Sequence, residues 1–230
     1  MVRVRSELKN TGYEIFIGAL SVLSIVNLAL FYLFLRNETL ETVLGVMNGL
    51  FSAIFLADFA YRLKTAPSRS GYFIRQYGWA DLLASLPFPQ FKILRVFRLY
   101  RVNQLLGTRG IRHIWRTVVR DRANSALLFL LLLGILVLQF GSLAMLYFEA
   151  GATGANITSA SDAIWYTMVT ISTVGYGDVY PITNAGRMVG VAIIIVGVGI
   201  FGTFTGYLAN FFLAPRKADA PTAGSSTAEG

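Results

Sequence analysis

Apolar segments of bilayer-spanning length recur along this chain, and they restrict its fold more than any other feature. Of the 230 residues, 55% are hydrophobic and only 14% are charged, too apolar a composition for a soluble domain of this size. Because a backbone inside a bilayer must satisfy its own hydrogen bonds, apolar stretches of about 20 residues indicate membrane-spanning helices. The sequence therefore predicts an all-α membrane protein with six spans: 15–35, 43–61, 77–87, 91–106, 126–148 and 188–212.

The connection between the last two spans is predicted to hold a short helix at 161–172, followed by five consecutive residues: Thr173, Val174, Gly175, Tyr176 and Gly177. Two glycines can adopt positive φ at little steric cost, so successive carbonyls can turn toward one axis. Val174 and Tyr176 can then pack into the surrounding wall, and Thr173 can offer its hydroxyl as well as its carbonyl. This pattern is typical of the potassium-channel selectivity filter, in which four loops replace the hydration shell of the ion. A glycine-rich turn is the alternative.

The basic residues indicate orientation. With both termini in the cytoplasm, fourteen Lys and Arg lie on the inner side and two, Arg36 and Arg187, on the outer side. The remaining four lie within the fourth span. This bias follows the positive-inside rule for a multi-pass protein of the cell membrane. The net charge of +8 is therefore read as a topology signal with attraction to anionic lipid, and not as a sign of nucleic-acid binding.

The fourth span carries cations at every third position: Lys92, Arg95, Arg98 and Arg101. On a helix this spacing forms a slowly winding stripe. Charges inside a span are costly unless they are partnered. Asp58 in the second span and Asp81 in the third are suitable partners for a guanidinium. A helix lying flat on anionic lipid, or static ion pairs that only hold the bundle together, remain alternatives.

These features together resemble the prokaryotic six-helix voltage-gated potassium channels over about 15–212. Phe55-x-x-Asp58-x-x-x-Arg62 is similar to the family's gating-charge transfer motif. The resemblance implies that Phe55 separates inner and outer water and that Asp58 and Asp81 are counter-charges. It also implies that Arg95, Arg98 and Arg101, with a lesser share from Lys92, are the gating charges.

The pore region shares the resemblance. The stretch 162–166 is similar to the family's pore helix, so Trp165 is implied to hydrogen-bond Asp178 behind the filter, with Tyr166 as further support. Gly197 aligns with the family's gating-hinge glycine, and Gly199, two residues on, is expected to take part in the same hinge. The stretch 197–202 also spells a dinucleotide-binding pattern, but no strand precedes it and it lies inside a span, so that interpretation is rejected.

The chain departs from the family pattern in three places. Gln104 and Gly107 stand where two further cations would continue the stripe. The third span is short, because Pro87 follows closely after Asp81. The Pro-x-Pro bend of the animal family's last helix is absent. These departures weaken the expectation of voltage sensing more than the expectation of a potassium pore.

The domains are predicted as a cytoplasmic N-terminus (1–14), a voltage-sensor-like domain (15–106), an amphipathic linker helix (107–121), a pore domain (122–213) and a disordered cytoplasmic tail (214–230). Four chains are expected to form a homotetrameric pore. The predicted function is a voltage-opened potassium channel, which is not an enzyme, needs no cofactor and has K⁺ as its permeant ion. The alternative is a potassium channel with a vestigial sensor, constitutively open or gated by lipid or ligand.

Overall fold

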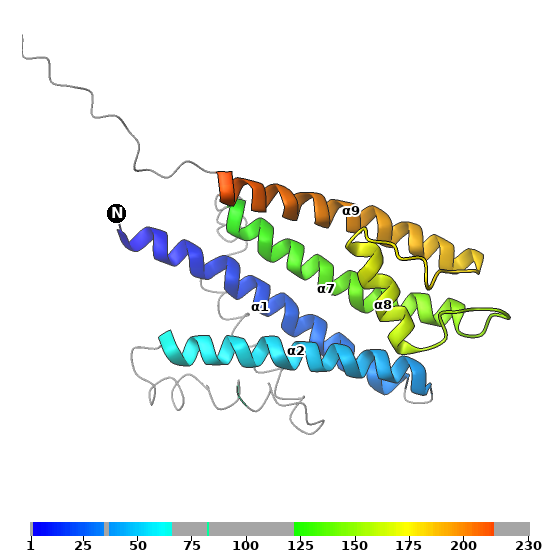
Figure 1. Cartoon of the computed structure of the whole chain (residues 1–230). Coiled ribbons are helices and arrows are strands. Elements are labelled where there is room, and N and C mark those ends of the chain that lie inside the picture. Colours follow the sequence, from blue (N-terminus) through cyan, green and yellow to red (C-terminus); the bar gives the residue numbers. More distant parts are fainter. Residues whose placement is uncertain (1, 35–36, 66–81, 83–121, 214–230) are drawn as a thin grey trace, which may run out of the picture.

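The computed structural model describes residues 2–34, 37–65, 82 and 122–213. The described residues form five helices: α1 (Val2–Leu33), α2 (Glu38–Thr65), α7 (Arg122–Glu149), α8 (Ala160–Ile171) and α9 (Asn184–Leu213) (Figure 1). Four of them contain stretches long and apolar enough to cross a membrane: Gly12–Leu33, Glu38–Lys64, Ala126–Glu149 and Asn184–Asn210. The all-helical fold is thus confirmed for this part of the chain, with four candidate membrane-spanning helices. Except for Leu82, the predicted third and fourth spans lie outside the described residues, as do the linker 107–121 and the tail 214–230.

The four long helices extend beyond the apolar windows that predicted them. α1 begins at Val2 and therefore runs through the boundary expected at 14–15. α2 begins at Glu38 because the Asn37 side chain accepts a hydrogen bond from the backbone N–H of Leu40 at 3.1 Å, as a helix N-cap does. Its first turn is acidic and its last turn basic, which suits the helix dipole. Hydropathy detects only the apolar part of a helix, whereas helical hydrogen bonding continues into its polar ends.

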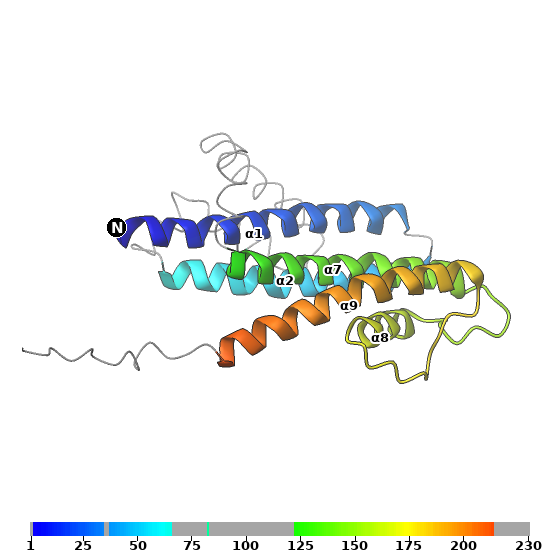
Figure 2. The ribbon, with the colours of Figure 1, turned by 90° about the horizontal axis from the view of Figure 1, so that it is seen from above.

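The helices form an elongated bundle. α1 and α2 are neighbours, α7 packs against both of them, and α9 lies on the other side of α7 from α1 (Figures 1 and 2). The N-terminus, the end of α2, the start of α7 and the end of α9 all lie at one end of the bundle, which we call the terminal end. α8, the end of α1 and the start of α2 lie toward the opposite end, the filter end (Figure 1).

Two apolar clusters join α1 and α2 to α7. The cluster nearer the filter end combines Leu40, Val43 and Leu44 of α2 with residues of α7, α8 and α9, and Leu30 of α1 packs against it. The cluster nearer the terminal end combines residues of α1 and α2, and it is covered by Leu132, Ile135, Leu136 and Leu138 of α7. The α1–α2 pair is thus packed along the length of α7, and the two clusters follow one another along the bundle.

The two halves of the bundle differ in burial. The apolar windows of α1 and α2 are 44% and 50% buried, whereas those of α7 and α9 are only 17% buried. Exposed side chains on α9 include Met188, Ile195 and Val198. Within the described structure, α7 and α9 therefore leave more of their apolar surface exposed than α1 and α2 do.

Candidate functional site

α8 is a short helix that the sequence fixes at both ends. At its start, Ser159 and Asp162 form a reciprocal capping box: the Ser159 hydroxyl oxygen accepts from the Asp162 N–H, and the Asp162 carboxylate accepts from the Ser159 N–H at 3.0 Å. The hydrogen bond from the Ser159 hydroxyl also lowers the pKa of Asp162. With 12 residues the helix is about 18 Å long, too short to cross a bilayer. It therefore ends inside the depth of the bundle.

The end of α8 leads directly into the candidate filter. The N–H of Thr173 donates to the carbonyl of Thr170, and that of Val174 donates to Val169, both at 3.1 Å. These two bonds define a Schellman C-cap, which places Thr173 at the left-handed position that glycine usually occupies. Thr173 has φ 59°, a conformation that costs about 1–2 kcal/mol for a residue with a Cβ. The C-cap that ends α8 thus also sets the backbone conformation of Thr173, the first residue of the candidate filter.

Positive φ recurs at every second residue of the filter segment. Gly175 has φ 59° and Gly177 has φ 77°, whereas Val174 and Tyr176 are not in this region. Alternation of positive and negative φ can turn successive peptide groups to the same side, as a row of ion-binding carbonyls requires. The sequence predicted the two glycines at these conformations, but it gave no reason to expect the same of Thr173. Residues 173–178 are all exposed in the single chain.

Aromatic side chains of α8 contact the candidate filter segment and the helix that follows it. The indole N–H of Trp165 on α8 donates to a carboxylate oxygen of Asp178 at 2.7 Å, which is the hydrogen bond that the family resemblance implied. The Trp165 ring also stacks on Tyr176 with an interplanar angle of 1°. Tyr166 lies on α8 against α9, where a Cβ at Gly190 would come within 2.7 Å of its hydroxyl oxygen. Both aromatic residues therefore link α8 to its surroundings, one toward the filter and one toward α9.

Glu149 is a structural residue of this region that sequence analysis missed. Its carboxylate is fully buried at the end of α7. It accepts hydrogen bonds from the backbone N–H groups of Ile182 and Thr183, both at 2.9 Å, and from the Thr183 hydroxyl at 2.7 Å. These donors precede the start of α9, whose dipole favours a negative charge there. A lone acid at the end of an apolar span was the sequence signal that could have revealed it.

The two candidate hinge glycines have different surroundings. A Cβ at Gly197 would lie 2.9 Å from the Cα of Ile171, the last residue of α8, whereas a Cβ at Gly199 would meet nothing within 4 Å. α9 is helical from Asn184 to Leu213 without interruption. In this state Gly197 therefore serves close packing of α9 against the end of α8. A bend at either glycine stays a prediction.

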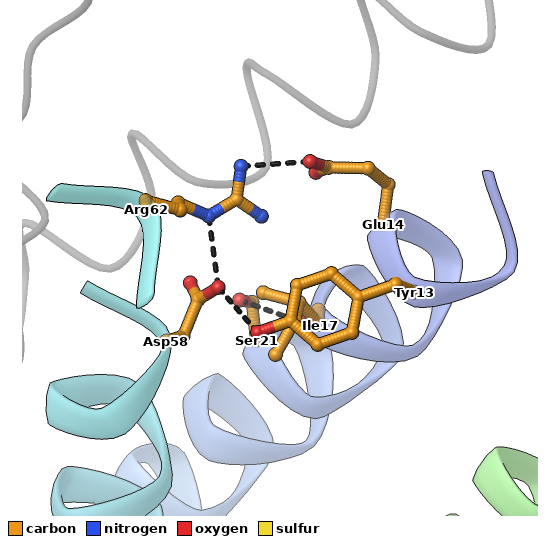
Figure 3. Close-up of polar contacts among 6 residues, drawn as sticks. All are labelled: Tyr13, Glu14, Ile17, Ser21, Asp58 and Arg62. Carbon is orange, nitrogen blue, oxygen red and sulfur yellow. Dashed lines mark hydrogen bonds and ion pairs between the residues drawn. The ribbon is translucent and has the colours of Figure 1, made fainter. Parts of the chain in front are cut away.

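Near the terminal end, α1 and α2 are joined by a buried charge cluster. Asp58 is only 4% exposed and accepts hydrogen bonds from the Tyr13 hydroxyl at 2.7 Å and from Nε of Arg62 at 2.8 Å (Figure 3). Nη1 of Arg62 also donates to Glu14 at 2.7 Å, which closes a bridge between the helices. Phe55 is fully buried one turn away, in the cluster nearer the terminal end. Sequence analysis singled out Phe55 and Asp58 but missed Tyr13 and Glu14, because their role depends on how α1 packs on α2.

The remaining sensor candidates cannot be placed. Asp81 and the cations of the fourth span, Lys92, Arg95, Arg98 and Arg101, lie outside the described residues. Within the described residues, no group of three or more His, Asp or Glu side chains could hold a metal ion.

Comparison with known proteins gives the class of the molecule. The family model described as "Ion transport protein" matches residues 10–214, so the chain belongs to the ion transport protein family, a family of channels and not of enzymes.

Individual relatives are named as potassium channels. The chain is 30% identical over 172 residues to the "Voltage-gated potassium channel" of Aeropyrum pernix, covering 69% of this chain and 57% of that protein. It is 32% identical over 159 residues to "Potassium voltage-gated channel protein Shal" of Drosophila melanogaster, covering 63% and 28%. It is 33% identical over 99 residues to "Calcium-gated potassium channel TvoK" of Thermoplasma volcanium, covering 43% and 28%. The matched region thus spans between about a quarter and three fifths of these relatives.

Proposed function

We propose that this chain is one subunit of a homotetrameric, potassium-selective channel of the cell membrane. The alternation of positive φ at Thr173, Gly175 and Gly177, directly after a short helix braced by Trp165 and Asp178, is the observation that carries the proposal. One chain supplies one filter loop, so a ring of carbonyls needs four copies around one axis. The exposure of residues 173–178 in the single chain leaves that surface open to the other copies.

Selectivity follows from the same backbone. Carbonyl oxygens replace the hydration shell of K⁺ more favourably than that of Na⁺, whether through cavity size or through the field of the carbonyl dipoles. The C-terminal end of α8 directs the negative end of its dipole toward the inner end of the filter and favours a cation there. K⁺ is the permeant ion in this proposal, and no other cofactor takes part.

Both termini are proposed to be cytoplasmic. The excess of Lys and Arg supports this orientation, and the N-terminus and the end of α9 lie at the same end of the bundle. α2 ends and α7 begins at that end too, which agrees with an even number of crossings between them and so with six spans in all. The basic inner side would attract anionic lipid.

Opening by membrane potential is the finer part of the proposal. The gating charges would move past Phe55 when the membrane potential changes, with Asp58 and Asp81 as their counter-charges. This displacement would move the gate. The gating charges are Arg95, Arg98 and Arg101. If about three charges in each of four subunits crossed the whole field, about 28 kcal/mol per 100 mV would be coupled to the pore, as an upper bound. The alternative is a potassium channel with a vestigial sensor that is constitutively open or gated by lipid or ligand. It is supported by the replacement of two stripe positions by Gln104 and Gly107.

Purified full-length protein in planar bilayers tests both parts. With K⁺ on one side and Na⁺ on the other, we expect a reversal potential far from zero and toward the K⁺ equilibrium value. A reversal potential near zero would contradict the filter assignment. Voltage steps in symmetrical K⁺ then separate the alternatives, because a vestigial sensor gives an open probability that does not change with voltage.

A further inference from the structure

Two buried carboxamides between the helices have polar atoms without a hydrogen-bond partner. Asn27 of α1 is 1% exposed and Gln139 of α7 is fully buried. Oδ1 of Asn27 and both Nε2 and Oε1 of Gln139 form no hydrogen bond. A buried polar group left in this state costs about as much as a lost hydrogen bond, so each such group in a folded protein calls for an explanation.

The orientation of the Asn27 amide is fixed. Its Nδ2 donates to the backbone carbonyl of Leu44 on α2 at 3.1 Å. A flipped amide would place its oxygen against that carbonyl, which is also only an acceptor. Oδ1 is therefore the atom that still needs a donor. Gln139 lacks a hydrogen-bond partner at both ends of its amide in the described structure.

The two amides lie at the same level of the bundle. On α1, Asn27 lies between Leu23, in the cluster nearer the terminal end, and Leu30, which packs on the cluster nearer the filter end. On α7, Gln139 likewise lies between Leu138 and Leu143, which belong to the same two clusters. α1 and α7 are in contact. Each amide is thus at the junction of the two clusters.

The helix faces agree with this placement. At 100° per residue, Gln139 is central among Ile135, Leu136, Leu143 and Leu146, which all pack in the clusters shared with α1 and α2. Asn27 is central in the same way between Leu23 and Leu30 on the buried face of α1. Both side chains therefore face the interior between α1, α2 and α7.

We propose that Asn27 and Gln139 hold a buried water molecule at this junction. Water supplies what the two amides lack: it donates to Oδ1 of Asn27, accepts from Nε2 of Gln139, and keeps a second donor for another acceptor. No hydrogen bond joins the two amides in the described structure, and one water between them would supply a partner to each. Buried waters typically make about three hydrogen bonds to groups that are otherwise unsatisfied.

The water joins the α1–α2 pair to α7 at mid-height. Apolar packing alone permits α1 to slide along α7, because lipid and side chains are similarly apolar. The hydrogen bonds of a bridged amide pair form at only one position of α1 along α7. The site is therefore a positioning device between the α1–α2 pair and the helices that carry the filter segment. It does not depend on which ion the protein conducts.

Replacement of Gln139 by methionine separates bound water from an empty, unsatisfied site. Gln139→Met keeps the length of the side chain and removes both amide atoms. If these atoms have no partner, their removal raises the melting temperature of the full-chain oligomer in detergent, because a desolvation cost is relieved. If they bind water, the melting temperature falls by on the order of 5 °C, because Asn27 Oδ1 is stranded. Leu143→Met, on the same buried face, is the matched control and changes no polar atom.

A double-mutant cycle with Asn27→Leu and a high-resolution map complete the test. Asn27→Leu also removes the hydrogen bond to Leu44, whether or not Gln139 is replaced. This loss therefore cancels when the two effects of Asn27→Leu are compared. We expect the double variant to melt higher than the sum of the two single shifts predicts, and density for one water between the amides. A rise in melting temperature for Gln139→Met, or additive shifts, would overturn the proposal. Coupling with no density between the amides would also overturn it and assign a direct amide–amide bond.

Discussion

Asp58 accepts a hydrogen bond from Nε of Arg62 at 2.8 Å, one turn along the same helix. The carboxylate expected to receive a moving sensor charge is therefore already paired in the described structure. Glu14 shares the same guanidinium. Among the described residues, Asp58 of α2 and Glu14 of α1 thus share one guanidinium, which joins the two helices.

Asp58→Asn should weaken the joint between α1 and α2. The change removes the charge that balances Arg62 in a site where Asp58 is only 4% exposed. Stranding a buried ion typically costs about 3–5 kcal/mol, and we expect about 1–3 kcal/mol here because Glu14 still contacts Arg62. The melting temperature of the oligomer in detergent measures this loss. Lys64→Gln, at an exposed position of α2, is the control, and equal melting of the two variants would show that the cluster does not stabilise the fold.

Arg98→Gln should make the conductance–voltage curve shallower, because fewer charges then cross the field for each opening. Macroscopic currents from reconstituted protein give the slope. Gln104→Asn leaves the number of charges unchanged and should leave the slope unchanged as well. If currents persist in Arg98→Gln with the native slope, the fourth span is a static anchor and the vestigial-sensor alternative holds.

Gly175→Ala should abolish selective conduction. The reason is conformational and not steric, because a Cβ at Gly175 would meet nothing within 4 Å while φ there is 59°. An L side chain in that region costs about 1–2 kcal/mol, and four subunits multiply the cost around one pore. Gly134→Ala on α7, where a Cβ is also unobstructed, should conduct with native selectivity. Selective current through Gly175→Ala would mean that residues 173–177 are not the filter.

Gly197→Ala and Gly199→Ala should differ, although both lie in one helical stretch of α9. A Cβ at Gly197 would lie 2.9 Å from backbone of α8, which cannot give way as a flexible side chain can. We expect Gly197→Ala to destabilise the oligomer by about 1–3 kcal/mol. Gly199→Ala should be neutral or slightly stabilising, because alanine favours the helix. If thermal melting does not separate the two variants, close packing of α9 on the end of α8 is not important for stability.

Glu149→Gln should loosen the start of α9. The carboxylate accepts hydrogen bonds through both oxygens, whereas a glutamine places an N–H₂ donor against one of these N–H or hydroxyl groups. We expect a loss of about 1.5–3 kcal/mol, the range for hydrogen bonds to a charged group. Glu38→Gln, at an exposed position of α2, serves as the control in the same melting assay. A melting temperature equal to that of the control would show that the buried carboxylate is dispensable.

Those features that depend on local sequence were predictable. Apolar runs of bilayer length located all four described spans, and the short helix expected at 161–172 is observed at 160–171, within one residue at each end. The positive φ of Gly175 and Gly177 also followed from residue type, because glycine alone adopts that region without a steric cost. The left-handed Thr173 did not follow, since it results from the way α8 ends.

Contacts between distant segments were not predictable in this way. Tyr13 and Glu14 lie 45 and 48 residues from their partners Asp58 and Arg62, and Glu149 lies 33 and 34 residues from Ile182 and Thr183. In the sequence, Tyr13, Glu14 and Glu149 are distinguished only as polar groups at the ends of spans. In the sequence, Gln139 is one polar residue in an apolar helix. Only the packing of the helices shows that it is fully buried at the level of Asn27.

By itself the sequence determined that this chain crosses a membrane as helices and carries a filter-like backbone segment between the last two of them. Both follow from local physics, the cost of apolar surface in water and the φ range open to each residue type. Only the tertiary structure decided which buried charges meet, that Gly197 packs against the end of α8, and which polar atoms remain without partners. The reason is that a buried polar group is stable or costly according to neighbours that come from far along the chain, and folding alone brings those neighbours together.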